Sequence, residues 1–257
     1  MDGGREAVAA LDCGTNSTRL LISDPAGEDV RLMRITRLGQ GVDATGTLDP
    51  DAIARTIEVL AGYRRRMDER GVTRARLVAT SAVRDAANGE MFLRAASEAS
   101  GVEAELLSGD AEGALAFAGA TASLDLDPAD VAIIDIGGGS TELVTAAPDV
   151  RAVSLALGCV RLTERFLIND PPTGPELGAA AAYVVSELEK AGAALPRLAD
   201  GGLTLIGVAG TISTLGALAL GLTHYDRDRI HHSVLSAPIV AEWCDRLAAE
   251  PSAARAA

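Results

Sequence analysis

The chain has 257 residues and a formal net charge of −13, and 48% of its residues are hydrophobic. This charge argues against a general nucleic-acid surface, which needs a basic field, and the length suits two domains of ordinary size. Three cysteines without a C-x-x-C pair favour a reducing compartment, and no signal-peptide pattern opens the sequence. We therefore expect a cytoplasmic protein that does not bind nucleic acid.

The first predicted element is a β-hairpin near the N-terminus. Residues 8–22 read VAALDCGTNSTRLLI, in which two apolar runs flank a turn of small residues. This pattern is typical of a hairpin, and glycine in the turn lets backbone N–H groups approach an anion closely. Arg19 follows the turn on an otherwise apolar strand, so its guanidinium is expected to need an anionic partner such as phosphate.

Helix and strand patterns alternate after this hairpin. Strands are predicted over residues 30–38, 76–80 and 102–107, and helices over residues 52–70 and 90–100. The segment SGDAEGALAFAGATA predicts a further helix that begins near Glu112, with Asp110 as its N-cap. Apolar periodicity breaks at residues 123–130, so two domains are expected, over residues 1–124 and 125–257.

A second hairpin is predicted where the pattern restarts. Residues 131–144 read VAIIDIGGGSTELV, and the order of Asp, Gly, Ser and Thr repeats that of the first hairpin. An ordinary hairpin with a permissive turn would explain one such string, but two strings indicate a duplicated domain that holds one nucleotide or phosphate between its halves. Neither string is a P-loop or a dinucleotide fingerprint. The repeated positions are Asp12, Gly14, Ser17 and Thr18, and Asp135, Gly137, Ser140 and Thr141.

The second half continues in an α/β pattern. A strand is predicted over residues 152–157, helices over residues 176–194 and 238–249, and a frayed tail from residue 251. Residues 201–223 carry no charge and are long enough to span a membrane, but glycine and hydroxyl residues interrupt their centre. We interpret this stretch as a buried strand over residues 203–208, a turn over residues 209–211 and a helix, so no membrane is expected as a partner.

A divalent metal is predicted at the second hairpin. Asp135 ends a buried strand beside a phosphate-sized turn, and Glu142 lies beyond that turn on the opposing strand. Mg²⁺ binds few carboxylates and keeps several waters, so Asp135 could hold Mg²⁺ and Glu142 its hydration shell. The alternative is a solvated hairpin mouth. Further phosphate donors are expected from Asn16, Ser17, Gly138, Gly139 and Ser140.

The paired strings D-x-G-[ST]-N-S-x-R-L and D-I-G-G-G-S-T-E resemble those of the exopolyphosphatase and guanosine pentaphosphate phosphohydrolase family. The resemblance runs from about residue 8 to about residue 247. It implies two ribonuclease-H-like domains of the actin-like ATPase superfamily, each with a five-stranded mixed sheet, and a cleft between them. It also implies a homodimer.

The resemblance also implies roles for single residues. Glu112 matches the catalytic glutamate of the family, although the residues alone favour a helix-capping acid. Arg84, expected in a loop, matches a phosphate-binding arginine, and its alternative is a surface ion pair with Asp85 or Glu90. Weaker candidates at the edges of the predicted site are Asp12, Gly14, Thr15, Cys159, Arg161, Gly210 and Thr211.

The function expected from these features is Mg²⁺-dependent hydrolysis of the terminal phosphate of inorganic polyphosphate. The alternatives are hydrolysis of guanosine pentaphosphate in the stringent response, an ATP-dependent kinase, and a sensor that binds without turnover. Family chains usually continue with R-A-D-x-I and G-L-R-x-G segments that are not found here. Longer members also carry helical domains that grip long polymers, so a preference for short chains is expected.

Overall fold

The computed structural model describes residues 6–24, 27–146 and 149–255. The chain forms two units, Met1–Glu112 and Gly113–Ala257. The division falls inside helix α5 (Gly109–Thr121), earlier than the boundary expected after residue 124. The physical reason is that Phe117 of α5 is buried among Val131, Ile133 and Val144 of the second sheet, so most of the helix belongs to the second unit.

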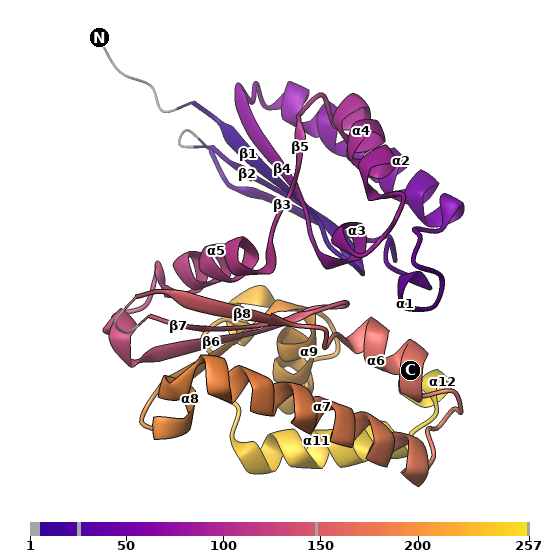
Figure 1. The fold of residues 1–257 in the computed structure, drawn as a ribbon. Coiled ribbons are helices and arrows are strands. Elements are labelled where there is room, and N and C mark those ends of the chain that lie inside the picture. Colours follow the sequence, from indigo (N-terminus) through magenta and orange to yellow (C-terminus); the bar gives the residue numbers. More distant parts are fainter. Residues whose placement is uncertain (1–5, 25–26, 147–148, 256–257) are drawn as a thin grey trace. The chain divides into compact units, whose positions relative to one another are not determined.

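The first unit is a five-stranded mixed sheet with the strand order β3-β2-β1-β4-β5. The first three strands are antiparallel, β4 pairs parallel with β1, and β5 pairs parallel with β4. Two long helices cover one face of the sheet (Figure 1). The elements are β1 (Val8–Cys13), β2 (Ser17–Ser23), β3 (Val30–Ile35), α1 (Val42–Thr45), α2 (Pro50–Glu69), β4 (Arg74–Ala79), α3 (Ser81–Arg84), α4 (Gly89–Ser100) and β5 (Ala104–Leu106).

Helix α2 shows how the sequence sets this packing. Asp49 caps its N-terminus by accepting from the N–H of Ala52 at 3.0 Å, and Pro50 occupies its first turn. Buried residues recur every three or four positions along one face, which turns toward the sheet. Tyr63 on this face donates to the carbonyl of Thr18 at 2.9 Å, which ties the helix to the start of β2.

The second unit repeats the plan of the first with a four-stranded sheet in the order β8-β7-β6-β9. Strands β6 to β8 are antiparallel and β9 pairs parallel with β6. Among the described residues no strand corresponds to β5, so the five-strand expectation holds for the first sheet only. The described residues after β9 form helices instead, over residues 209–219, 227–230, 237–249 and 252–255. The strands are β6 (Val131–Ile136), β7 (Thr141–Thr145), β8 (Arg151–Leu155) and β9 (Thr204–Val208).

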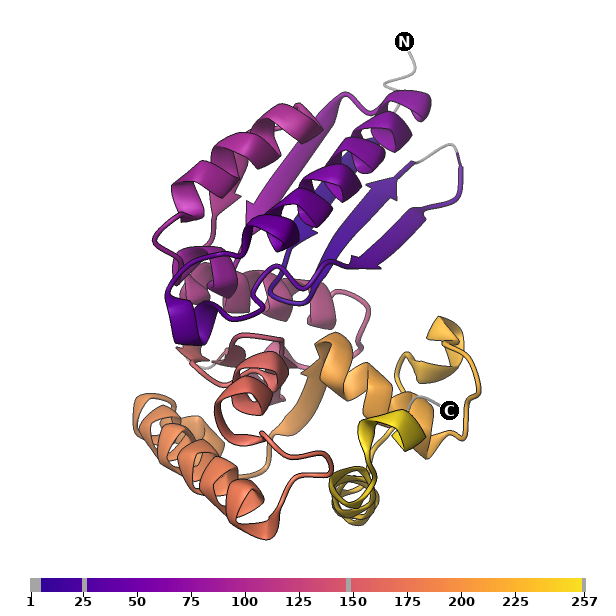
Figure 2. The same ribbon diagram turned by 90° about the vertical axis from the view of Figure 1, so that its right-hand side faces the viewer.

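Helices cover both faces of the second sheet (Figures 1 and 2). Phe117 of α5 packs on the face that carries Val144, whereas Tyr183 of α7 packs on the face that carries Leu143. Alternate residues of a strand point to opposite faces, so α5 and α7 lie on opposite sides. The remaining elements are η1 (Pro128–Asp130), α6 (Cys159–Phe166), α7 (Gly174–Ala194), α8 (Pro196–Asp200), α9 (Ala209–Ala219), α10 (Arg227–Ile230), α11 (Ala237–Ala249) and α12 (Ser252–Arg255).

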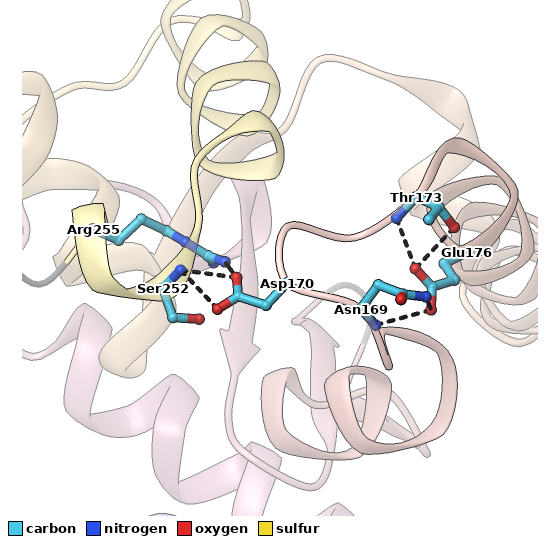
Figure 3. A network of polar contacts seen from close by, with 6 residues as sticks. All are labelled: Asn169, Asp170, Thr173, Glu176, Ser252 and Arg255. Carbon is cyan, nitrogen blue, oxygen red and sulfur yellow. Dashed lines mark hydrogen bonds and ion pairs between the residues drawn. The ribbon is translucent and has the colours of Figure 1, made fainter.

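Two expectations for the second half were wrong. The turn expected over residues 209–211 is already helix, because Ala209 adopts a left-handed φ of 69° that redirects the chain from β9 into α9 within one residue. The tail is not frayed over its described part, because Asp170 accepts from the N–H of Ser252 at 2.8 Å and contacts Arg255 (Figure 3). Across the described residues, none of the helices is both long and apolar enough to cross a membrane.

Candidate active site

The two glycine turns have the same geometry. In the first, the N–H of Gly14 donates to the carbonyl of Ser17 at 3.0 Å, and in the second the N–H of Gly137 donates to the carbonyl of Ser140 at 3.0 Å. A Cβ added to either glycine would lie 3.2 Å from that same carbonyl oxygen. The repeat seen in the sequence is therefore a repeat of backbone structure.

The carbonyls of the first turn face the chain that follows β3. Asn16 accepts from the N–H groups of Thr36 and Arg37 at 3.1 and 3.0 Å, and Thr15 accepts from Gly39 at 2.8 Å. The C=O and N–H of one peptide unit point in opposite directions. The N–H groups of Asn16 and Ser17 are therefore directed away from this segment, which is the arrangement that anion-binding nests have.

In the second turn, the N–H groups that donate to the carbonyls come from helix α6. The N–H groups of Cys159 and Val160 donate to the carbonyls of Gly137 and Gly138 at 3.0 and 2.9 Å. Arg161 donates through Nε to the carbonyl of Gly139 at 2.8 Å. By the same geometric argument, the N–H groups of Gly139 and Ser140 point away from α6.

Gly158 makes this approach of α6 possible. A Cβ at this position would lie 2.2 Å from the carbonyl oxygen of Gly138 and 2.4 Å from the nitrogen of Gly139. Both neighbours are backbone atoms, so only glycine fits. Cys159 follows at the first position of α6 with an exposed thiol, and it contributes its N–H rather than a nucleophile to the turn.

Thr15 is part of the support of the first turn. Its hydroxyl lies 2.9 Å from the hydroxyl of Ser81 at the start of α3, and its side chain is buried. This contact joins the turn to the end of β4. The neighbouring Cys13 is buried beside Asp12, and desolvation raises the pKa of its thiol far above the usual range. A thiol held in this neutral form packs as an apolar residue and does not attack phosphate.

The strand register places groups of opposite charge at the same position of the two hairpins. Asp12 lies opposite Arg19 across β1 and β2, and Asp135 lies opposite Glu142 across β6 and β7. Residues opposite each other in a sheet point to the same face. Each turn is thus followed at the same place by a different group, a guanidinium in the first unit and a carboxylate in the second. The first suits direct phosphate binding, and the second suits a cation.

Glu142 is held in a fixed position inside the second unit. Its side chain is 1% exposed, and its Oε1 accepts from the hydroxyl of Ser154 on β8 at 2.7 Å. Ser154 lies opposite Glu142 in the strand register, so Asp135, Glu142 and Ser154 form one row across three strands. Two neighbouring carboxylates beside an N–H nest are a donor set that Mg²⁺ accepts together with water and substrate oxygens. The residues present fit such an ion, although no cluster of three or more ligating side chains occurs among the described residues.

Arg84 and Glu112 form the charged pair of the first unit. Arg84 ends helix α3 rather than lying in a loop, because residues 81–84 make one helical turn directly after β4. Its Nη1 donates to the carbonyl of Leu107 at 2.8 Å and lies 3.7 Å from Oε2 of Glu112. The ion partner of Arg84 is therefore Glu112, while Glu90 pairs with Arg94 at 4.0 Å.

Glu112 lies in the first turn of α5, and its side chain is 20% exposed. The hydroxyl of Ser108 accepts from the N–H of Ala111 at 3.2 Å, so Ser108 takes the capping place expected for Asp110. Gly113, the next residue, lies against β7 and β8, where a Cβ would come within 2.7 Å of Ala152 Cβ. This glycine lets the part of α5 that belongs to the second unit lie close to the second sheet.

Gly210 and Thr211 lie in the first turn of α9. Val208, which ends β9, pairs with Asp135 in the parallel register, so α9 begins beside the carboxylate row. The structure therefore brings Asp135, Glu142, the second turn and the start of α9 together within the second unit. Within the first unit it groups Arg84 with Glu112, and places Arg19 in the strand that leaves the first turn. The role of Ser154 was not predicted, because only the register of β7 with β8 reveals it.

Two units that each carry a mixed sheet and a matching glycine turn define a duplicated α/β fold. A sequence profile described as the Ppx/GppA phosphatase family matches residues 30–257. The chain belongs to this family, and it is a phosphoanhydride hydrolase.

Named relatives agree with this assignment. Exopolyphosphatase 2 of Mycobacterium tuberculosis is 45% identical over 255 residues, which cover 93% of this chain and 79% of that protein. The crystal structure of an exopolyphosphatase-like protein matches with a TM-score of 0.89 and 37% identity, over 97% of this chain and 80% of that one. A Ppx/GppA family member from Aquifex aeolicus matches with a TM-score of 0.76 and 36% identity, over 96% and 80% of the two chains.

Proposed function

We propose that the protein is an exopolyphosphatase that removes the terminal phosphate of inorganic polyphosphate with Mg²⁺ as cofactor. The observation that carries the proposal is the pair of matching turns, each with its carbonyls held by a following segment and its N–H groups directed outward. Such nests bind anionic oxygens without a positive side chain. They would therefore let a protein with a net charge of −13 hold a polyanion.

Glu112 is the proposed general base. It takes a proton from water as the water oxygen attacks the terminal phosphorus, and the bond from that phosphorus to the bridging oxygen breaks. The products are orthophosphate and a polymer one unit shorter. Arg84 orients the carboxylate through their 3.7 Å contact and, with Arg19, offers a guanidinium to phosphoryl oxygens.

Asp135 and Glu142 would hold Mg²⁺ at the second turn. When bound, this ion would neutralise charge on the phosphoryl oxygens. Ser154 keeps the Glu142 carboxylate in one orientation, and Asp135 lies beside it in the same row. The proposal requires both turns, because the first supplies a guanidinium and the second supplies carboxylates for the metal.

Phosphate release by the purified full chain tests the proposal. Long-chain polyphosphate, tripolyphosphate and guanosine pentaphosphate are supplied separately, with and without Mg²⁺. We expect orthophosphate release to depend on Mg²⁺ and kcat/KM to be higher for polyphosphate than for guanosine pentaphosphate. Among the polyphosphates, we expect a higher kcat/KM for short chains. A higher kcat/KM for guanosine pentaphosphate would assign the alternative substrate, and binding without release from any of them would assign a sensor.

The variants Glu112→Gln and Asp110→Asn form a matched pair in the first turn of α5. Loss of a general base reduces the rate by about 10²–10⁴-fold, so Glu112→Gln should lose most turnover while it still binds polyphosphate. Asp110→Asn removes the same charge two residues away and should keep the wild-type rate. The opposite result would move the base to Asp110.

A further inference from the structure

A threonine hydroxyl joins the start of β2 to the segment that follows β3. Thr18 is the second residue of β2 and comes directly after the first turn. Its Oγ1 lies 2.9 Å from Oγ1 of Thr36, and both residues are buried, with exposed fractions of 0% and 1%. The N–H of Thr36 donates to the carbonyl of Asn16 at 3.1 Å. The hydroxyl pair therefore lies beside the backbone contact that holds the first turn.

The second unit has the same feature. Thr141, which corresponds to Thr18 in the repeat, begins β7, and its hydroxyl donates to the carbonyl of Leu157 at 2.6 Å. Thr141 is also buried. Two residues after Leu157, the N–H of Cys159 donates to the carbonyl of Gly137 at 3.0 Å. In both units a buried hydroxyl thus joins the start of the second strand to the segment that holds the turn.

The strand registers show that the two contacts are geometrically equivalent. Each threonine bonds to the residue two positions beyond the one that lies opposite it in the neighbouring strand. The opposite residues are Arg34 for Thr18 and Leu155 for Thr141. The partner is a side-chain hydroxyl in the first unit and a backbone carbonyl in the second. What the two units share is therefore the position of the threonine hydroxyl itself.

The threonines lie on the covered face of each sheet. Leu20 and Leu143, two residues farther along each strand, are buried with residues of helices α2 and α7. Alternate residues of a strand point to opposite faces, so Arg19 and Glu142 point the other way. Each hydroxyl thus holds the strand from its covered face, at the position directly before the guanidinium or the carboxylate of the proposed site.

A hydroxyl that only fills a core is the simpler explanation for one such contact, because buried polar groups are hydrogen-bonded in any fold. Valine has nearly the same shape, suits a buried strand and needs no partner, as at Val144 in β7. A hydrogen bond has a preferred direction that an apolar contact lacks. Threonine at both equivalent positions is therefore informative, because its hydroxyl fixes a direction that valine would leave open.

We propose that Thr18 and Thr141 are positioning residues whose hydroxyls fix the two glycine turns for phosphate binding. The inference rests on the proposed function, because it assigns the geometry of the phosphate-binding turns to these two hydroxyls. Neither threonine touches the substrate, since both point to the covered faces. Groups that orient a binding residue from outside the site typically change affinity or activity by about 10–100-fold when they are removed.

The test is calorimetric binding of tripolyphosphate, in the presence of Mg²⁺, to chains that also carry Glu112→Gln. Thr18→Val and Thr141→Val should each lower the affinity by about tenfold or more. Thr18→Ser and Thr141→Ser keep the hydroxyl and should restore most of it. Thr145→Val is the matched control, because Thr145 is a buried threonine on the same face of β7, four residues farther from the turn. The control should bind like the parent.

A double variant separates positioning from a purely structural role. Thr18→Val leaves the buried hydroxyl of Thr36 without this partner and should lower the urea midpoint, whereas Thr18→Val with Thr36→Val removes both hydroxyls together. The double variant should therefore regain most of the wild-type midpoint while its affinity for tripolyphosphate stays about tenfold low. The proposal is overturned if affinity recovers together with stability, or if the single valine variants bind like the control.

The two units supply independent tests. If Thr141→Val does not fold, the variants of Thr18 and Thr36 decide the outcome. Binding is measured without turnover, so a wild-type chain that binds tripolyphosphate but releases no orthophosphate would refute the proposed function alone. A parent chain that does not bind tripolyphosphate would refute both.

Discussion

Replacement of Gly158 by alanine should disturb the second turn more than any other single methyl group. The added Cβ would meet the carbonyl oxygen and carbon of Gly138 at 2.2 and 2.3 Å. Ordinary contact begins near 3.4 Å, so α6 and the turn must separate by about 1 Å. Overpacking of this kind costs about 1–3 kcal/mol, and we expect the upper end because both neighbours are backbone.

The same displacement lengthens the hydrogen bonds from Cys159 and Val160 to the turn. A catalytic group misplaced by about 1 Å loses about 10²-fold in rate, so kcat/KM for polyphosphate should fall by about that factor. Stability is measured by urea unfolding followed through Trp243, which reports on the second unit because it is the only tryptophan. Phosphate release is measured on the same samples.

Gly178→Ala is the matched control. Gly178 lies inside α7 with open space around the position of a Cβ, so alanine should stabilise the chain by about 0.5–1 kcal/mol and leave turnover unchanged. The reasoning is refuted if the free energy of unfolding of Gly158→Ala lies within about 0.5 kcal/mol of the wild-type value and kcat/KM is unchanged. Such a small effect is typical of surface substitutions, and it would mean that α6 does not approach the second turn closely.

Three further predictions concern neighbouring features. Ser154→Ala should weaken Mn²⁺ binding, followed by the signal of the free ion, because Glu142 loses the donor that orients it, and Ser154→Thr should restore much of it. Gly113→Ala should cost about 1–3 kcal/mol in urea, because its Cβ would lie 2.7 Å from that of Ala152. Glu176, whose pKa is lowered to about 2 chiefly by the N–H of Thr173, should stabilise the fold above pH 4.5 and lose this effect as the pH falls toward 2 (Figure 3).

Each of these has an outcome that would contradict it. Unchanged Mn²⁺ affinity in Ser154→Ala would show that the hydroxyl does not position the carboxylate. Wild-type stability in Gly113→Ala would mean that α5 can move off the second sheet at no cost. For Glu176, the difference in unfolding free energy between wild type and Glu176→Gln should shrink as the pH falls from 4.5 to 2. A difference that is constant with pH would show that ionisation of Glu176 does not stabilise the fold.

The hairpins and their duplication could be read from the sequence, because a run of apolar residues, a glycine turn and a second run leave few other structures. Helix α2 was equally readable, since Asp49, Pro50 and the apolar spacing all act locally. These features depend on neighbours in the chain. The local sequence alone therefore determines them.

Contacts between distant segments could not be read in the same way. The hydrogen bond from Ser154 to Glu142 depends on the register of β7 with β8, and the contact of Arg84 with Glu112 depends on where α3 and α5 begin. The start of the second unit at Gly113 was missed because a glycine within a helical pattern does not reveal what it lies against. The second sheet has four strands instead of the five that the resemblance implies, because the described residues after β9 form only helices.

The central claim is that one phosphate-binding turn was built twice and that both copies are needed. Gly14→Ala and Gly137→Ala test it most directly, because each adds a Cβ 3.2 Å from the equivalent carbonyl oxygen and so disturbs its own turn by a few tenths of an ångström. Orthophosphate release from polyphosphate should fall by about tenfold or more in each folded variant. Release at the wild-type rate from either one would contradict the account.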